Sequence, residues 1–323
     1  MRSLTKDKNL IRNRSIKLAA ILAVILGMFS ASTPASDEKS DSSNEVPVRM
    51  VVTVKPRHNG PAPAVGQNDV KVYHRDQLNK VTGWIPLQGD RAGLELFILI
   101  DDSSGSSFGL QLDSIKKFIE EQPPTTAIGV GYMRNGTVFT VQNLTTDHAL
   151  AAKSLRLPIG SSADNSPYLS VTDLMKKWPV SENRREILML TSGVDALNGN
   201  PFSNPYLDAA VERAQKGGFI IYSIYTPRAG FAGHGRFRSN LAQSGLDILS
   251  QKTGGETYYL GLGAPVDIAP YLREVSFSLK NQYQLTYLTK GAKKPTLEPV
   301  KVKTETPNTG LIAAQAGYVG TGM

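Results

Sequence analysis

The chain has 323 residues, of which 40% are apolar, 20% charged and 7% aromatic, and these values are typical of a globular protein. They exclude a chain that is disordered throughout, a collagen-like repeat and a multi-span membrane protein. The absence of cysteine excludes disulfides, thiolate metal sites and a cysteine nucleophile. Residues 1–35 account for five of the eight net positive charges, so the rest is nearly neutral, which argues against a nucleic-acid partner.

The N-terminal segment has the three parts of a secretory signal. Basic residues precede the apolar run Leu18–Phe29, and small residues follow it. This run is too short to span a bilayer comfortably. We expect cleavage after Ala35, which predicts a secreted, periplasmic or cell-envelope protein with no membrane span once residues 1–35 are removed. The alternative is an uncleaved membrane anchor, because residues 18–35 carry no charge.

Two segments with β character flank the central part of the chain. Residues 36–46 are polar and acidic, which predicts a flexible linker. Residues 47–93 contain strand-like runs without helical periodicity and predict an N-terminal β segment. Residues 282–323 return to this character and predict a C-terminal β segment.

Between these segments, residues 94–281 alternate apolar strands with amphipathic helices. The continuous apolar runs typical of buried parallel strands are 94–100, 185–191 and 218–226. The expected helices are 110–122, 167–178, 204–217, 239–253 and 266–281. This alternation predicts an α/β domain with a doubly wound, mostly parallel sheet and helices on both faces.

The loop after the first apolar strand carries candidate metal ligands. It reads Asp101-Asp102-Ser103-Ser104-Gly105-Ser106. Ligands of open α/β sheets bind beyond the carboxyl ends of the strands, and carboxylate and hydroxyl oxygens suit Mg²⁺ or Mn²⁺. We favour the complete Asp-x-Ser-x-Ser register of Asp102, Ser104 and Ser106 over the one that begins at Asp101 and lacks a hydroxyl. The alternative is a polar turn whose serines cap the next helix.

This loop, with the apolar strand before it and Gly109 and a helix after it, resembles the metal-ion-dependent adhesion site of the von Willebrand factor A family. The resemblance covers about residues 47–320 and implies the Rossmann-like fold of that family. It is closest to a secreted, acidobacterial-type branch, on account of the β segment before the domain, a Thr-Gly-Gly run in residues 249–261 and the strand-like runs at 281–288 and 300–320.

The resemblance implies further ligands at the same edge of the sheet. A hydroxyl from a second loop corresponds to Ser166, with Thr172 as the alternate. Ser192 stands where the family places an aspartate, and Asp195 lies three residues after Ser192. Loss of a carboxylate predicts weaker binding of the cation. We therefore expect a degenerate site for Mg²⁺ or Mn²⁺ formed by Asp102, Ser104, Ser106, Ser166 and Asp195, with Asp101, Thr172 and Ser192 as alternates.

In such a site a carboxylate of the partner replaces a water on the ion, and no reaction follows. The resemblance therefore implies a noncatalytic protein that binds a protein partner through a carboxylate. The segment 227–240 follows a strand, and its arginine and aromatic side chains are typical of interfaces. The candidate partner-binding residues are Arg228, Phe231, His234, Arg236, Phe237 and Arg238. The alternative is a solvated connection between a strand and a helix.

Two other functions stay open at this stage. The first is a metal-independent scaffold or interaction module of the cell envelope that acts through the β segments. The second is a serine hydrolase that pairs Ser104 or Ser192 with His234, but the sequence contains neither a nucleophile-elbow motif nor a phosphate-binding loop. A noncatalytic binding protein is therefore the favoured prediction.

Overall fold

The computed structural model describes residues 44–160, 165–198, 200, 203–227, 236–259 and 266–322, except for the side chains of Ser106, Ser107 and Arg236. The predicted signal and most of the predicted linker lie outside these residues. The chain divides into two units at Asp41–Ser42, and every described residue belongs to the second unit. Within it, no helix is both long enough and apolar enough to cross a membrane.

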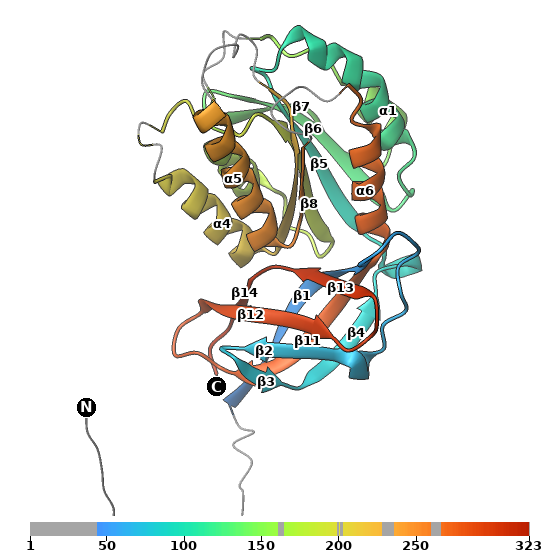
Figure 1. Ribbon diagram of the computed structural model, residues 1–323, viewed down its shortest axis with the longest axis vertical. Helices are drawn as coiled ribbons and strands as arrows, with labels where there is room; N and C mark the ends of the chain where they lie inside the picture. Colours follow the sequence, from blue (N-terminus) through green and yellow to red (C-terminus); the bar gives the residue numbers. More distant parts are fainter. Residues whose placement is uncertain are drawn as a thin grey trace, which may run out of the picture. The chain divides into compact units, whose positions relative to one another are not determined.

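A six-stranded sheet forms the centre of the α/β domain (Figure 1). Its strands are, in spatial order, β10 (Thr257–Tyr258), β9 (Phe219–Tyr225), β8 (Arg184–Thr191), β5 (Leu94–Asp101), β6 (Thr126–Arg134) and β7 (Thr137–Thr145). Neighbours from β10 to β6 are parallel, and β7 is antiparallel to β6. This strand order confirms the predicted doubly wound, mostly parallel sheet. We call the ends where its parallel strands begin and finish the amino edge and the carboxyl edge.

Helices cover both faces of this sheet, with α1 and α6 on one side and α4 and α5 on the other (Figure 1). The α-helices are α1 (Leu112–Glu120), α2 (His148–Lys153), α3 (Pro167–Lys177), α4 (Pro205–Gly217), α5 (Arg236–Thr253) and α6 (Ala269–Lys280). Short 3₁₀ helices occupy Gln67–Asp69, Gly89–Arg91 and Ser106–Gln111. Leu96 and Ile98 of β5 pack with α1, α2 and α6, whereas Phe97 and Leu99 pack with α3, α4 and α5. Successive side chains of a strand point to opposite faces, so one apolar run supplies both cores.

The flanking β segments form two four-stranded antiparallel sheets, and each sheet takes strands from both segments. One contains, in order, β13 (Thr309–Ala313), β1 (Glu45–Pro56), β11 (Gln282–Lys290) and β4 (Val81–Pro86). The other contains β14 (Ala316–Val319), β12 (Thr296–Thr304), β2 (Val70–His74) and β3 (Gln77–Asn79). Buried side chains of both sheets, including Val52, Val72 and Leu285, share one core. We call these eight strands the β module.

The β module contacts the amino edge of the six-stranded sheet. Lys55 of β1 forms an ion pair with Glu256 at 2.5 Å and lies 3.6 Å from Glu274 of α6. The side-chain amide of Gln282 in β11 donates a hydrogen bond to the hydroxyl of Tyr222 in β9 at 3.3 Å. These contacts link the N-terminal and C-terminal strands of the module to the α/β domain.

The Thr-Gly-Gly run lies at the same junction. Gly254 has a φ of +87°, and a Cβ there would lie 2.7 Å from the backbone nitrogen of Ala314 in the β module. A Cβ on Gly255 would lie 2.1 Å from the carbonyl oxygen of Ile221. Both distances are too short for a side chain, so these glycines end α5 and also permit the close approach of neighbouring backbones.

Candidate functional site

The carboxyl edge of the sheet centres on Asp101, the last residue of β5. Its side chain is 1% exposed. One carboxylate oxygen accepts hydrogen bonds from the backbone N–H of Ser103 at 3.0 Å and from its hydroxyl at 2.6 Å. The same oxygen accepts one from the amide of Asn165 at 2.8 Å, and the other oxygen accepts one from the hydroxyl of Thr191 at 2.9 Å. Hydrogen-bond donors of the protein therefore stabilise this buried negative charge.

Asp102 is completely buried and contacts a different set of residues. Arg156, which follows α2, donates to both carboxylate oxygens, from Nη1 at 2.8 Å and from Nη2 at 3.0 Å. The backbone N–H of Ile159 donates to one of them at 3.0 Å, and Nε of Arg134 lies 3.7 Å from the other. A two-point guanidinium–carboxylate pair is strong and directional, so Arg156 neutralises Asp102 inside the protein.

Tyr132 of β6 fixes the position of Arg156. Its hydroxyl donates to the carbonyl oxygen of Arg156 and accepts from the backbone N–H of the same residue, both at 2.7 Å. The guanidinium carbon lies 3.7 Å from the centroid of the tyrosine ring, which is a cation–π contact. The hydrogen bonds to Asp102 raise the pKa of Arg156, so its positive charge is retained.

The other two predicted ligands of this loop are Ser104 and Ser106. The hydroxyl of Ser104 is buried and has no hydrogen-bond partner among the described residues. Ser106 begins a 3₁₀ helix, and its side chain is outside the description. Of the predicted ligands Asp102, Ser104 and Ser106, the only carboxylate is that of Asp102, and it accepts hydrogen bonds from Arg156. Of the alternate ligands, Thr172 lies inside α3 and lines a cavity between α3 and α4. The hydroxyl of Ser192 accepts a hydrogen bond from the backbone N–H of Val194.

Ser166 and Asp195 do lie together at this edge. Ser166 caps the N-terminus of α3, where its hydroxyl accepts from the backbone N–H of Leu169 and donates to Asp195 at 2.9 Å. Asp195 also accepts from the side-chain amide of Asn204 at 3.2 Å and from the backbone N–H groups of residues 197 and 198. Asp195 therefore organises the loop between β8 and α4.

The described residues do not fit a divalent cation in this arrangement. Mg²⁺ requires a nearly octahedral set of oxygen ligands with available lone pairs. Asp101, Asp102 and Asp195 instead accept hydrogen bonds from three separate groups of donors, and Ser192 brings no charge. Within the described part of the chain, no three Asp, Glu or His side chains form a group that could hold a metal.

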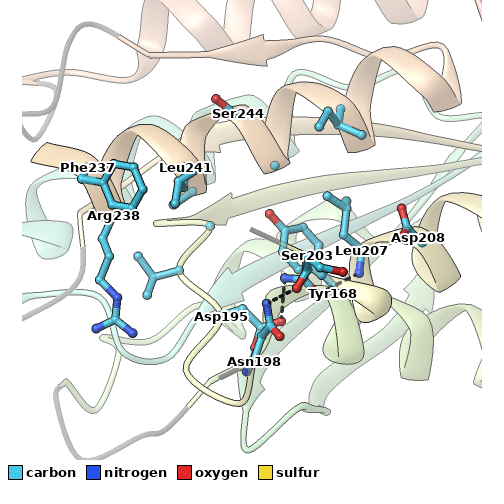
Figure 2. Close-up of a pocket in the computed structure, with 16 residues that line it drawn as sticks. Tyr168, Asp195, Asn198, Ser203, Leu207, Asp208, Phe237, Arg238, Leu241 and Ser244 are labelled. Atoms are coloured by element: carbon cyan, nitrogen blue, oxygen red, sulfur yellow. Dashed lines mark hydrogen bonds between the residues drawn. The ribbon is translucent and has the colours of Figure 1, made fainter. Parts of the chain in front are cut away.

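A cavity of about 530 Å³ opens beside Asp195. Figure 2 shows Asp195 and Asn198 on the loop after β8, with Phe237, Arg238 and Leu241 of α5 on the opposite wall. Phe237 is 57% exposed. The cavity therefore joins one predicted metal ligand to two predicted partner-binding residues.

The remaining residues of the predicted partner-binding segment are not placed. Arg228, Phe231 and His234 lie outside the described residues. Arg236 begins α5, but its side chain is not described. Of the six candidate partner-binding residues, only Phe237 and Arg238 have described side chains.

Three residues of this edge were not predicted as site residues. Thr191 ends a buried strand beside the predicted loop, and that position is a signal for a site residue. Arg156 and Asn165 lie 54 and 64 residues from their carboxylate partners, in a connection without a motif. Pairing over such distances leaves no local pattern in a single sequence.

No protein-family model matches the sequence, and no curated protein matches it. Solved structures that resemble the chain include von Willebrand factor A domains. BatB from Bacteroides thetaiotaomicron is 16% identical with a TM-score of 0.42, over 58% of this chain and 97% of that one. The vWF domain of the pilus tip protein Mfa5 from Porphyromonas gingivalis is 11% identical with a TM-score of 0.42, over 60% and 95%.

A third similar structure is proximal thread matrix protein 1 from the mussel byssus, described with a zinc-occupied adhesion-site motif. It is 12% identical with a TM-score of 0.45, over 64% of this chain and 49% of that one. Likenesses this distant assign neither a ligand nor a partner to this chain. The description of the fold rests on the strand order and the two cores given above.

Proposed function

We propose that this chain is an exported, noncatalytic binding protein that holds a protein partner at the carboxyl edge of its sheet without a divalent cation. The observation that carries the proposal is the pairing of Asp102 with Arg156, at 2.8 and 3.0 Å. Together with the four hydrogen bonds to Asp101, it satisfies both carboxylates of the loop from within the protein. Export is supported by the signal-like run Leu18–Phe29.

The cavity between α4 and α5 supports the position of the partner. Aromatic and arginine side chains supply most of the binding energy at protein interfaces, and Phe237 and Arg238 are both exposed on its wall. A guanidinium binds a carboxylate directly. Arg238 can thus take an acidic group of the partner, which is the role that the family resemblance gives to a metal ion.

Two of the three described histidines contact groups other than serine hydroxyls. His74 is buried in the β module, where it contacts Glu298 at 2.5 Å and Tyr287 at 3.0 Å. His148 contacts the carbonyl oxygen of Thr126 at 2.8 Å. A serine hydrolase needs a base within hydrogen-bond reach of its nucleophile, and neither of these histidines contacts a serine among the described residues. His234, the base of the hydrolase alternative, lies outside the described residues.

Site-specific photo-crosslinking tests this proposal. The photoreactive amino acid benzoylphenylalanine replaces Phe237 in one variant of the full chain and Leu78 in another, and both are irradiated in the cells that produce the protein. Leu78 lies on the edge strand β3 of the β module and is 63% exposed, against 57% for Phe237, so it is a matched control away from the carboxyl edge. We expect one discrete crosslinked protein from position 237 and none from position 78.

Chelation separates the cation-independent proposal from its alternative. The crosslink at position 237 should persist in EDTA, because a guanidinium and apolar surface need no ion. A crosslink that disappears in EDTA and returns with Mg²⁺ would show cation-dependent binding instead. Absence of a crosslink at 237, or equal crosslinks at 237 and 78, would contradict the position of the partner and favour a scaffold that acts through the β module.

A further inference from the structure

A second cavity, of about 480 Å³, lies at the amino edge of the sheet. This is the opposite end of the parallel strands from Asp101 and Asp102. Three segments enclose it, namely the connection from β4 to β5, the connection from α1 to β6 and the end of α6. Its walls are mainly apolar. The apolar side chains that line it are those of Leu87, Ala92, Leu94, Pro123, Pro124 and Leu279. This volume and this lining are typical of sites for small molecules.

The charged residues that line this cavity are all basic. Among the described residues they are Arg184 and Lys280, and no acidic residue lines the cavity with them. Neither residue forms an ion pair with a carboxylate in the described part of the chain. The cavity therefore combines apolar walls with positive charge that is not neutralised at contact distance.

Neutral acceptors hold the guanidinium of Arg184 in place. It donates to the carbonyl oxygens of Ala92 at 2.9 Å and Leu279 at 3.1 Å, and also to the side-chain carbonyl of Gln282. These acceptors fix its orientation but leave its charge intact. Glu186 on the same strand is completely buried, and burial raises its pKa to about 7, so near neutral pH it offsets the charge only in part.

We propose that this cavity binds an unbranched fatty acid of medium chain length, with the carboxylate at Arg184 and Lys280 and the alkyl chain against Leu87, Ala92 and Leu279. A neutral apolar molecule would leave the two cations without an anion at a less polar site. A small anion such as acetate would leave the apolar walls in contact with water. An amphiphilic anion satisfies both the charge and the apolar surface.

Isothermal titration calorimetry of the full chain with sodium butanoate, hexanoate and octanoate tests the proposal. Each added methylene should tighten binding up to about fourfold, which corresponds to about 0.8 kcal/mol of apolar burial. 1-Octanol has the same chain without the charge, and we expect it to bind at least tenfold more weakly than octanoate. No binding of octanoate, equal affinity for octanol, or affinity that is independent of chain length would overturn the proposal.

Variants locate the binding at this cavity. Ala92→Phe places a ring among the lining residues while the backbone bonds of residue 92 remain, and it should abolish octanoate binding. Lys280→Gln, at the end of α6, should weaken octanoate binding about tenfold. Lys252→Gln is the matched control, because Lys252 lies in the last turn of α5 and does not line the cavity. Octanoate binding that survives Ala92→Phe in a variant with unchanged thermal unfolding would also overturn the proposal.

Discussion

The two edges of the six-stranded sheet each bury a carboxylate completely, but they treat it differently. At the carboxyl edge, both oxygens of Asp102 accept hydrogen bonds from Arg156. At the amino edge, neither oxygen of Glu186 has a hydrogen-bond partner among the described residues, although Arg184 lies two positions away on β8. The guanidinium of Arg184 is directed to backbone carbonyls instead.

The comparison teaches that burial alone does not decide whether an acid is charged, because the placement of hydrogen-bond donors around it matters as well. Burial raises the pKa of Glu186 to about 7, and the nearby Arg184, Gln282 and Tyr222 offset only part of that effect. The carboxyl edge therefore contains the ion pair of Asp102 and Arg156. The amino edge contains Glu186, which keeps its proton up to about neutral pH. Four experiments test what stabilises each edge of the sheet.

The largest effect is expected from removal of the arginine at the carboxyl edge. Arg156→Ala leaves Asp102 buried without its ion pair, which should lower the free energy of unfolding by about 3–5 kcal/mol. Arg185→Ala is the control, because Arg185 also lies over an aromatic ring, at 4.8 Å from that of Phe219, but donates to the carbonyl oxygen of Gly217 and has no carboxylate partner among the described residues. We expect the control to lose about 1 kcal/mol. Urea unfolding measures both, and equal losses would show that the buried pair is unimportant.

A pH-dependent effect is expected at the amino edge. The folded protein keeps the proton of Glu186 up to about pH 7, whereas the unfolded chain releases it near 4.5. The stability that this proton provides is complete below pH 4.5 and is lost as the pH rises to about 7. From pH 5 to 8, Glu186 should lower the free energy of unfolding by about 2–3 kcal/mol.

Glu186→Gln should remove this pH dependence because an amide does not titrate. The control is Glu121→Gln, since the side chain of Glu121 is 64% exposed at the end of α1. Urea unfolding at pH 5 and pH 8 measures the three proteins. If the free energy of unfolding changes equally between pH 5 and pH 8 in Glu186→Gln and in the wild type, Glu186 does not keep its proton in the folded protein.

A smaller difference, between two matched glycine variants, is expected where the β module meets the amino edge. Gly218 and Gly254 both have a positive φ, of +65° and +87°, but only Gly254 has backbone atoms within reach of a Cβ. Gly218→Ala should cost about 1–2 kcal/mol for the left-handed conformation alone. Gly254→Ala should cost about 1–3 kcal/mol more, since the new methyl group would push against Ala314. Equal losses in urea unfolding would mean that the module tolerates displacement at this point.

The smallest effect is expected from divalent cations. A cation at about 100 times its dissociation constant stabilises a folded protein by about 2.7 kcal/mol, which shifts thermal unfolding by several degrees. We expect no shift when millimolar Mg²⁺, Mn²⁺ or Ca²⁺ replaces EDTA, because protein donors satisfy the carboxylates of the carboxyl edge. A shift in the wild type that is lost in Asp101→Asn would show that this edge binds a cation.

The sequence predicts the α/β domain well because its signals are local. The apolar run 94–100 and the helical patterns after it are read from neighbouring residues, and they correspond to β5 and the helices around it. The pairing of strands within the β module is not local, so the sequence predicts two flanking segments without showing that they share two sheets. The assignment to a secreted branch of the family remains a prediction from the sequence.

The candidate site is predicted only in part for the same reason. The loop at 101–106 is found because it follows a buried strand, but the sequence does not show which of two adjacent aspartates faces which neighbours. Arg156 and Asn165 determine the surroundings of these two carboxylates, and both come from a distant connection. The pattern of potential ligands therefore gave no sign of the guanidinium that pairs with Asp102.

The mixed strand order of the β module has a consequence for the kinetics of folding. Thr53 of β1 and its hydrogen-bond partner Gln282 of β11 are 229 residues apart. Contacts so distant in sequence form slowly, whereas the α/β domain between them is built from closer neighbours. During synthesis, β1 is made long before its partner strands and exposes two unpaired edges that can join other copies. Closure of the β module should therefore be the slow step of folding, and the step at which chaperones matter most.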